Sequence, residues 1–431
     1  MKKLTRLIYE DMRPALGVTE PGAIAFAVSK AKEYVNGSLK DIHVVLNSGM
    51  YKNAFTCGIP NSNEVGNKHI AALGYVAADA SRELECLDSV RRTDDLEASE
   101  LVKQGKVRVE MGGISSEISI TATVTTDEGS ASVSIRGSHT NITQIIQNGR
   151  VIEHTSPAKS KPDKTHITKP TNTHEHEIHR HTLRQLLNYV RSVPIQEIEF
   201  ISKAYDLNLS LFESAIDSRR TTITKQLHKK NGSQVISSDE HTTSALLCTA
   251  AIEARVLGLP RPAMSITGSG AHGIIATLPL YAAHKVNGYS KEQLLRATAL
   301  SYLVCMYIKE YSGKLSAFCG CAIAAGTGMA CALAYLRGGS LRSLTLTIQN
   351  MASSITGMIC DGGNHGCALK GLVAVDAAYR AVELAMDGIA ISREHGINGL
   401  TPEDTMRNMG LIASPGMVET EGTIVNIMRN K

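Results

Sequence analysis

The sequence is organised around Leu315-Ser-Ala-Phe-Cys-Gly-Cys-Ala-Ile-Ala-Ala-Gly-Thr-Gly-Met-Ala-Cys-Ala-Leu-Ala-Tyr335, a run without charge between Lys314 and Arg337. The run is long enough to cross a bilayer. It is also crowded with Gly, Ala, Ser and Thr, holds three Cys, and is not strongly apolar. We therefore expect it to lie buried inside a helical domain, away from lipid.

The chain around this run also has a helical pattern. Residues 183–431 read as nearly all helix, and residues 1–82 as helical and rich in small residues, apart from a strand at 42–46. Apolar side chains recur at the three- and four-residue spacing of a buried helix face. The clearest examples are Leu183–Val190, Ala245–Leu257, Leu294–Tyr307, Ile323–Leu336 and Ala374–Ala385.

Residues 83–153 have a different pattern. Asp94–Gln104 predicts a short helix with Asp94 as its cap and Gly105 just past its end. Alternating apolar and polar residues then predict strands, with a hairpin turn at Asp127-Glu128-Gly129-Ser130 and a further strand or short helix over His139–Gln147.

These patterns predict an α+β protein with four segments. A mostly α-helical catalytic domain is built from residues 1–82 and 183–431, and a small α+β domain is inserted at 83–153. Residues 154–182, with three Pro and six His, are expected to form a linker. Its histidines could bind a transition metal, or the segment could be a solvated loop.

Composition narrows the function. The 431 residues carry 45 Lys plus Arg against 41 Asp plus Glu, a net charge of only +4, with no Trp and five Phe. This argues against nucleic acid or an anionic membrane as the main partner. The first residues lack a secretory signal, so the nine Cys are expected to be reduced thiols in the cytoplasm.

The cysteines are unevenly distributed. Six of the nine lie between residues 305 and 367, and four of these sit in the glycine-flanked motifs Cys319-Gly-Cys321 and Cys360-Asp-Gly-Gly-Asn-His-Gly-Cys367. The spacing does not match a zinc site, because no paired C-x-x-C units occur. Thiolates gathered from distant segments are typical of an iron–sulfur centre, although buried Cys can also be plain small hydrophobes.

Other polar residues also stand beside glycines in apolar surroundings. Buried polar groups need partners, so these motifs either satisfy one another or line a ligand cavity. They are Ala15–Pro21, Tyr51–Asn53 with Gly58–Pro60, Gly268–Gly273, and Tyr307–Lys309 with Gly313–Ser316.

These motifs resemble the L-cysteine desulfidase family, whose helical domain is related to the alpha domain of iron–sulfur L-serine dehydratases. The resemblance spans nearly the whole chain and includes His139-Thr-Asn-Ile142 in the insert. It is carried by Ala15–Pro21, Lys52–Pro60, Met264–Gly273, Tyr307–Leu315, Ser316–Gly326, Gly357–Lys370 and the tail Asn408–Lys431.

The resemblance implies an oxygen-labile 4Fe–4S cluster held by three Cys, with one open iron that acts as a Lewis acid. It also implies β-elimination from a small amino acid, giving pyruvate and ammonia, without pyridoxal phosphate (PLP). The implied ligands are Cys319 or Cys321, together with Cys360 and Cys367. It suggests a homodimer or larger assembly.

The chain departs from the family at three places near the implied pocket. Val18 stands where the family has a Cys that is taken to be essential, and His272 and Asn364 replace a Gln and a Lys. His272 and His365 are additions that could act as base or ligand, or simply bond the backbone. Two alternatives therefore stay open: a related enzyme that uses another metal, and a non-catalytic protein that binds an amino acid or a partner protein.

The candidate site residues follow from these motifs. The candidate acid–base residues are Lys370, His272, Glu20 and Asp361. The candidate substrate-binding residues are Thr19, Lys52, Asn53, Ser269 and Lys314. Lys309 is a further cation that could bind a carboxylate or form a surface ion pair.

Overall fold

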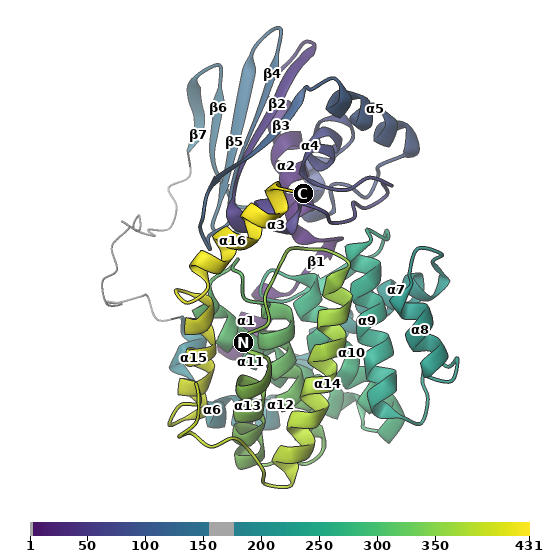
Figure 1. Ribbon diagram of the computed structural model, residues 1–431, viewed down its shortest axis with the longest axis vertical. Helices are drawn as coiled ribbons and strands as arrows, with labels where there is room; N and C mark the ends of the chain where they lie inside the picture. Colours follow the sequence, from purple (N-terminus) through teal and green to yellow (C-terminus); the bar gives the residue numbers. More distant parts are fainter. Residues whose placement is uncertain (1–2, 155–175) are drawn as a thin grey trace.

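The structure, a computed structural model, describes residues 3–154 and 176–431. Most of the predicted linker, including His166 and His174, lies outside these residues. The described part confirms the α+β fold: a six-stranded sheet with its own helices stands above a mostly helical body (Figure 1). In this part, no helix is long and apolar enough to cross a membrane.

The helical body confirms the predicted helical pattern. Its helices are α1 Lys3–Asp11, α6 Leu183–Ser192, α7 Ser202–Asp217, α8 Ile223–Lys230, α9 Glu240–Val256, α10 Gly270–Asn287, α11 Lys291–Ser312, α12 Gly326–Leu336, α13 Leu341–Ile355, α14 Gly366–Met386 and α15 Pro402–Ala413. Short helical turns occupy Glu177–Arg180, Ile195–Glu197 and Glu199–Ile201.

Helix α12 lies at the centre of this body, packed among α10, α11, α13 and α14. A side chain at Gly328 would place its Cβ 2.2 Å from the Ser301 carbonyl oxygen of α11. Small residues are therefore needed because a neighbouring backbone approaches closely. This explains why Leu315–Tyr335 is rich in Gly and Ala and lies in a protein core.

The sheet has the strand order β3-β2-β4-β5-β6-β7, and only the β2–β3 pair is parallel. The strands are β2 Leu39–Asn47, β3 Val107–Gly113, β4 Ser119–Thr126, β5 Ser130–Arg136, β6 Ile142–Gln147 and β7 Arg150–His154. Helices α2 Thr19–Lys32, α4 Asn67–Val76 and α5 Arg92–Lys103 lie on the same side of it (Figure 1). Alternate residues of β4 and β5 are buried under α2, as the period of two predicts.

Two local predictions need correction, and one that left two forms open is resolved. Strand β2 lies inside the sheet between β3 and β4, so residues 39–47 share the sheet of the expected insert. Helix α5 starts at Arg92, and the Asp94 side chain bonds back to the Arg91 amide at 2.8 Å, so it is not the cap. Of the two forms expected over His139–Gln147, the strand is found, from Ile142 onward.

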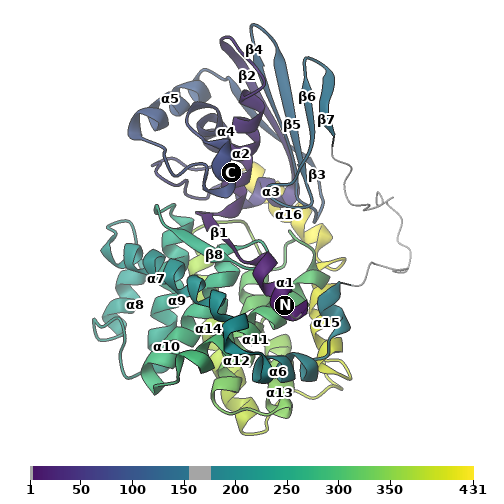
Figure 2. The same cartoon turned by 180° about the vertical axis from the view of Figure 1, so that it is seen from behind.

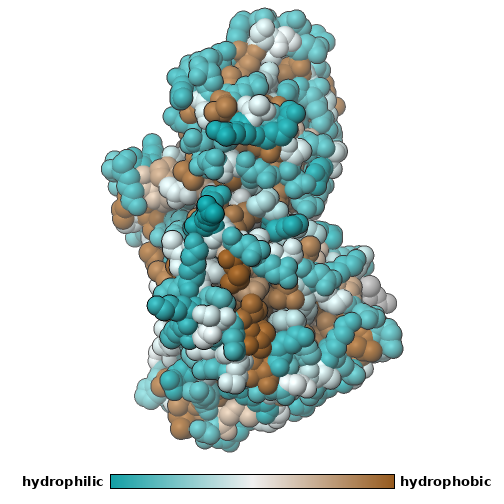
Figure 3. All heavy atoms as spheres, turned by 90° about the vertical axis from the view of Figure 1, so that its right-hand side faces the viewer, coloured by the Kyte–Doolittle hydropathy of each residue, from teal (hydrophilic) through white to brown (hydrophobic). Residues whose placement is uncertain are grey.

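Two connections join the sheet layer to the helical body. Strands β1 Arg13–Leu16 and β8 Pro262–Ser265 pair antiparallel at the junction (Figure 2). The last helix, α16 Val418–Arg429, crosses the junction and packs against the short helix α3 Ser48–Asn53. The face in Figure 3 narrows between the two parts, and hydrophobic side chains gather mainly on its lower, helical half.

Candidate active site

A cavity of about 340 Å³ lies at this junction. The sheet contributes the loop between β5 and β6, residues 137–140, and the helical body contributes the turn before α10 and the segment 314–321. The start of α2 and the end of α3 complete the wall. The cavity has the size of a site for a small molecule, and it collects most of the glycine-centred motifs.

Two thiols, those of Cys321 and Cys360, face this cavity. Their loops are joined by reciprocal backbone bonds: the Cys319 amide donates to the Met358 carbonyl at 3.0 Å, and the Cys360 amide donates to the Ala317 carbonyl at 2.6 Å. Cys321 opens a π-helical turn, Cys321–Ala325, which leads into α12. Such turns occur often at functional sites.

The four glycine-flanked thiols influence one another electrostatically. A hydrogen bond from Cys319 holds the pKa of Cys321 well below its ordinary value, and the same contact, with burial, raises the pKa of Cys319. Burial, followed by the neighbouring Cys360 and Cys321, raises the pKa of Cys367 to about 12. The four thiols are therefore close enough to influence one another, and two of them line the cavity.

This grouping of thiols fits a multi-iron cluster. In the described ranges, no three His, Cys, Asp or Glu side chains are placed to share a single metal ion. A 4Fe–4S cluster binds its thiolates through different irons, so its ligands need only surround a common volume. Cys360, Cys367 and either Cys319 or Cys321 are the residues that would hold such a cluster, since their thiols influence one another electrostatically.

Val18 lies next to this thiol group. Its side chain is buried, and a Cβ on Gly363, in the loop between Cys360 and Cys367, would lie 2.8 Å from its Cγ1. Position 18, where the L-cysteine desulfidase family has a Cys, thus lies beside the loop between Cys360 and Cys367. An isopropyl group cannot coordinate iron, so this position supplies no ligand here.

His272 faces the cavity from α10. The Thr267 hydroxyl donates to the Ile266 carbonyl at 2.7 Å and also forms a hydrogen bond with His272 Nδ1, which holds the ring in place. Thr267 has φ +51° and donates its amide to the buried Asp11 carboxylate. Burial raises the pKa of Asp11. The ring is therefore held with Nε2 toward Gly320 and Cys321.

His139 comes from the β5–β6 loop and faces the same cavity. Its Nε2 is buried without a hydrogen-bond partner in the described residues and lies 4.0 Å from Glu20 Oε1. Glu20 accepts a bond from Asn53 Nδ2 at 2.8 Å. Burial lowers the pKa of His139, with Lys314 and Arg255 adding to the shift and Glu20 opposing it. A neutral imidazole in the wall of a cavity is suited to accept a proton.

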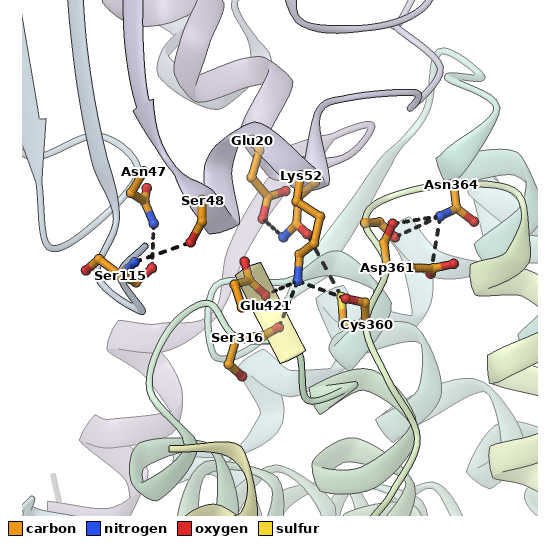
Figure 4. A network of polar contacts seen from close by, with 12 residues as sticks. Glu20, Asn47, Ser48, Lys52, Ser115, Ser316, Cys360, Asp361, Asn364 and Glu421 are labelled. Atoms are coloured by element: carbon orange, nitrogen blue, oxygen red, sulfur yellow. Dashed lines mark hydrogen bonds and ion pairs between the residues drawn. The ribbon is translucent and has the colours of Figure 1, made fainter. Parts of the chain in front are cut away.

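Lys52 does not face the cavity. Its Nζ donates to Glu421 Oε2 at 2.6 Å, to the Cys360 carbonyl at 2.8 Å and to the Ser316 carbonyl at 3.1 Å (Figure 4). The Lys52 and Glu421 side chains are both almost fully buried. Lys52 thus joins the two loops of the thiol group to α16 and is not free to bind substrate.

The variant Glu421→Gln is expected to lower the free energy of unfolding by about 3–5 kcal/mol, because it leaves the Lys52 ammonium buried without its counter-charge. Chemical denaturation measures this change. The exposed neighbour Glu419, replaced in the same way, is the control and should change stability by less than about 0.5 kcal/mol. Equal effects of the two variants would show that the buried pair does not anchor α16.

Three further candidates are paired away from the cavity. Lys370 forms a short ion pair with Asp361. Burial lowers the pKa of Lys370, but the hydrogen bond to Asp361 and the nearby thiols outweigh it, so the net shift is upward. This is opposite to the lowered pKa that a lysine base would need. His365 Nε2 contacts Glu253 at 2.7 Å, and Glu253 also binds the start of α8.

The structure therefore brings together part of the predicted set. Lining the cavity are Glu20, His272, Thr19, Asn53, Ser269, Lys314, Cys321 and Cys360. Outside its wall are Lys52, Lys370, Asp361, Cys319 and Cys367. Sequence reasoning missed His139, which it cited only within a family motif, and Asp11, which no pattern marked. Lys309, predicted to bind a carboxylate or to form a surface ion pair, lines the cavity, and burial and Lys314 lower its pKa.

Known proteins resemble this chain along its whole length. Residues 81–426 match the family described as serine dehydratase alpha chain. A UPF0597 protein of Clostridium botulinum is 39% identical over 425 residues, covering 99% of this chain and 98% of the relative. UPF0597 proteins of Caldanaerobacter subterraneus and Desulfatibacillum aliphaticivorans are 34% and 31% identical, covering 99% and 98% of this chain and 98% and 96% of the relatives.

The family match covers most of the chain and takes in the segments that build the thiol group and the turn before α10. It also confirms the resemblance drawn from the glycine and cysteine motifs. The chain belongs to the serine dehydratase alpha chain family, and its function is of the lyase type.

Proposed function

We propose that the protein is an iron–sulfur-dependent lyase that eliminates the β-substituent of a small amino acid, L-cysteine or L-serine, and yields pyruvate and ammonia. The observation that carries the proposal is the grouping of four thiols from two cross-bonded loops beside the cavity, with Cys321 and Cys360 in its wall. Cys360, Cys367 and either Cys319 or Cys321 would hold a 4Fe–4S cluster, without PLP.

A bound cluster with one open iron would supply Lewis-acid polarisation of the leaving hydroxyl or thiol. The protein supplies the rest. His139 Nε2, neutral and without a partner among the described residues, takes the α-proton of the substrate. Glu20, 4.0 Å away, stabilises the resulting imidazolium, and Asn53 keeps the Glu20 carboxylate in place. Thr19 and Ser269, which also line the cavity, provide hydroxyl groups for the substrate.

This assignment predicts the pH profile. The base must be neutral, and burial lowers the pKa of His139, so protonation sets in only below the ordinary histidine value of about 6.5. We expect kcat/KM to stay level as the pH falls to about 6.5 and to decline below it. Steady-state kinetics under anaerobic conditions measure the profile. A decline centred above pH 7 would argue against His139 as the base.

The other elements of the proposal concern surroundings and assembly. We place the protein in the cytoplasm, where reduced thiols persist; its nine cysteines are all free. We also propose a homo-oligomer, whose size analytical ultracentrifugation would measure. Neither nucleic acid nor a membrane is a proposed partner, on the strength of the small net charge.

Val18→Cys tests the departure from the family. The buried Val18 side chain is replaced by a smaller one next to Gly363, so the fold should lose at most about 1.5 kcal/mol of stability. If a thiol at this position completes the site, the variant should hold its iron longer in air and turn over faster. Iron release after exposure to oxygen measures the first effect. No gain in either would mean that Val18 is an adaptation.

The alternative is a diverged protein that uses another metal or only binds an amino acid, and the buried Val18 is the observation that favours it. Anaerobic purification distinguishes the two. A brown protein with about four irons and four sulfides supports the lyase. A colourless protein that holds zinc or manganese supports the first form of the alternative, and a metal-free protein stabilised by an amino acid supports the second.

A further inference from the structure

Arg255, near the end of α9, has a buried guanidinium group that forms no ion pair with a carboxylate of the described residues. The residue is only 5% exposed. Within residues 3–154 and 176–431, no carboxylate lies at ion-pair distance, and the one hydrogen bond is from Nη2 to Thr19 Oγ1 at 3.3 Å. The Nε–H is buried with no partner in the same ranges. A guanidinium stays charged at any ordinary pH, and burying it unpaired costs several kcal/mol.

The group lies directly behind the wall of the cavity. A Cβ on Gly270 would lie 2.7 Å from Arg255 Nε, so glycine is needed there to admit the guanidinium. Thr19, which Arg255 touches, and Ser269, which precedes Gly270, both face the cavity. The unpaired charge is therefore next to the space that a ligand would fill.

Two long helices also start at this place. Thr19 is the first residue of α2 and Gly270 the first of α10, and neither helix has a side-chain hydrogen bond at its N-cap. The free N–H groups and the dipole of each helix favour an anion there. The charge of Arg255 and the two helix N-termini therefore all favour binding of an anion at the same point of the cavity wall.

Of the other cations near the cavity, two are paired with a carboxylate, and Arg13 is exposed to solvent. Lys52 is paired with Glu421, and Lys314 lies 3.3 Å from Glu310. Lys309 donates to the Gly313 carbonyl at 2.6 Å. Glu20, the acidic group in the same wall, accepts from Asn53 and lies beyond ion-pair distance of Arg255. Among the described residues, Arg255 and Lys309 are therefore the two buried cations near the cavity that have no carboxylate at ion-pair distance. Burial lowers the pKa of Lys309, whereas the guanidinium of Arg255 keeps its charge.

We propose that Arg255 is the counter-charge for the carboxylate of the ligand, which binds where α2 and α10 start, between the Thr19 and Ser269 hydroxyls. That the ligand is an amino acid rests on the proposed function. The site then discriminates by charge: amino acids bind, and amines of the same size that lack the carboxylate do not. Arg255 acts in recognition and is not a catalytic residue.

Binding of L-alanine and ethylamine to the metal-free full-length chain tests this proposal. L-Alanine has no β-substituent to eliminate, and ethylamine is its counterpart without the carboxylate. We expect L-alanine to bind in calorimetric titrations and to raise the melting temperature, and ethylamine to do neither. In Arg255→Gln the dissociation constant for L-alanine should rise about tenfold or more, with a smaller rise in Arg255→Lys. The exposed Arg261→Gln is the matched control and should bind as the wild type does.

Measurements of stability and iron content show whether Arg255 recognises the ligand or instead supports the fold or the thiolates. Removing an uncompensated buried charge should leave the metal-free Arg255→Gln chain at least as stable as the wild type. After anaerobic reconstitution its iron content should also equal that of the wild type. The proposal is overturned if the wild type does not bind L-alanine, if Arg255→Gln binds it equally well, or if this variant unfolds or loses iron because the guanidinium supports the fold or the thiolates. Arg255-dependent binding of L-alanine to a chain that never takes up iron would instead sink the iron–sulfur lyase and keep this inference.

Discussion

Replacing Cys360 by serine is expected to abolish cluster assembly and to lower kcat/KM by more than about a thousandfold. Its thiol faces the cavity, and its backbone joins the two loops that carry the other candidate ligands. A lost ligand removes the Lewis acid, which contributes several kcal/mol to the transition state, and each 1.4 kcal/mol corresponds to a factor of ten. Iron and sulfide content after anaerobic reconstitution, together with turnover of L-cysteine and L-serine, measure the effect.

The other thiols complete this experiment. Cys367→Ser should have the same effect as Cys360→Ser. Of Cys319→Ser and Cys321→Ser, one should lose the cluster and the other should keep it, which would settle the third ligand. Cys331→Ser is the control, because this thiol is buried in α12 outside the cavity wall. Full clusters in all four variants of the thiol group would refute the assignment.

His139→Gln is expected to lower kcat by about two to four orders of magnitude, the usual contribution of a positioned general base. The amide cannot take a proton, yet it has nearly the length of the ring and should leave the β5–β6 loop in place. Because the cluster ligands lie on other segments, iron content and the affinity for L-alanine should not change. Anaerobic steady-state kinetics measure the loss, and iron assays show that the site is otherwise intact.

His228, on α8 away from the cavity, is the matched control for this variant. His228→Gln should retain wild-type kcat. If His139→Gln is as active as the wild type, His139 is not the base and another residue of the cavity wall must be. His272→Gln would then be the next variant to test. A His139→Gln chain without iron would show that the loop supports the cluster.

The helical body could be predicted from the sequence because its signal is local. The three- and four-residue spacing in Ala245–Leu257 and Leu294–Tyr307 is a property of each segment alone. The sheet was harder to place, because strand β2 pairs with β3 and β4, which lie more than 50 residues further along the chain. The sequence of residues 39–47 does not indicate which strands they pair with.

In the candidate site, too, features with a local sequence signal could be predicted, and contacts between distant segments could not. The glycines around Cys319 and Cys360 marked the thiol group, because a glycine-flanked thiol is unusual in a helical core. Lys52 looked like a substrate ligand, but its partner Glu421 is 369 residues away. Arg255 stands in an ordinary helical repeat, and its lack of an ion pair with a carboxylate of the described residues is a property of the folded chain alone.

Iron and acid-labile sulfide, measured per chain in protein purified without oxygen, test the central claim most directly. The account predicts about four of each, with the electron paramagnetic resonance signal of a 4Fe–4S cluster after reduction, and loss of both in Cys360→Ser. A wild-type chain that takes up neither iron nor sulfide under reconstitution conditions would contradict it.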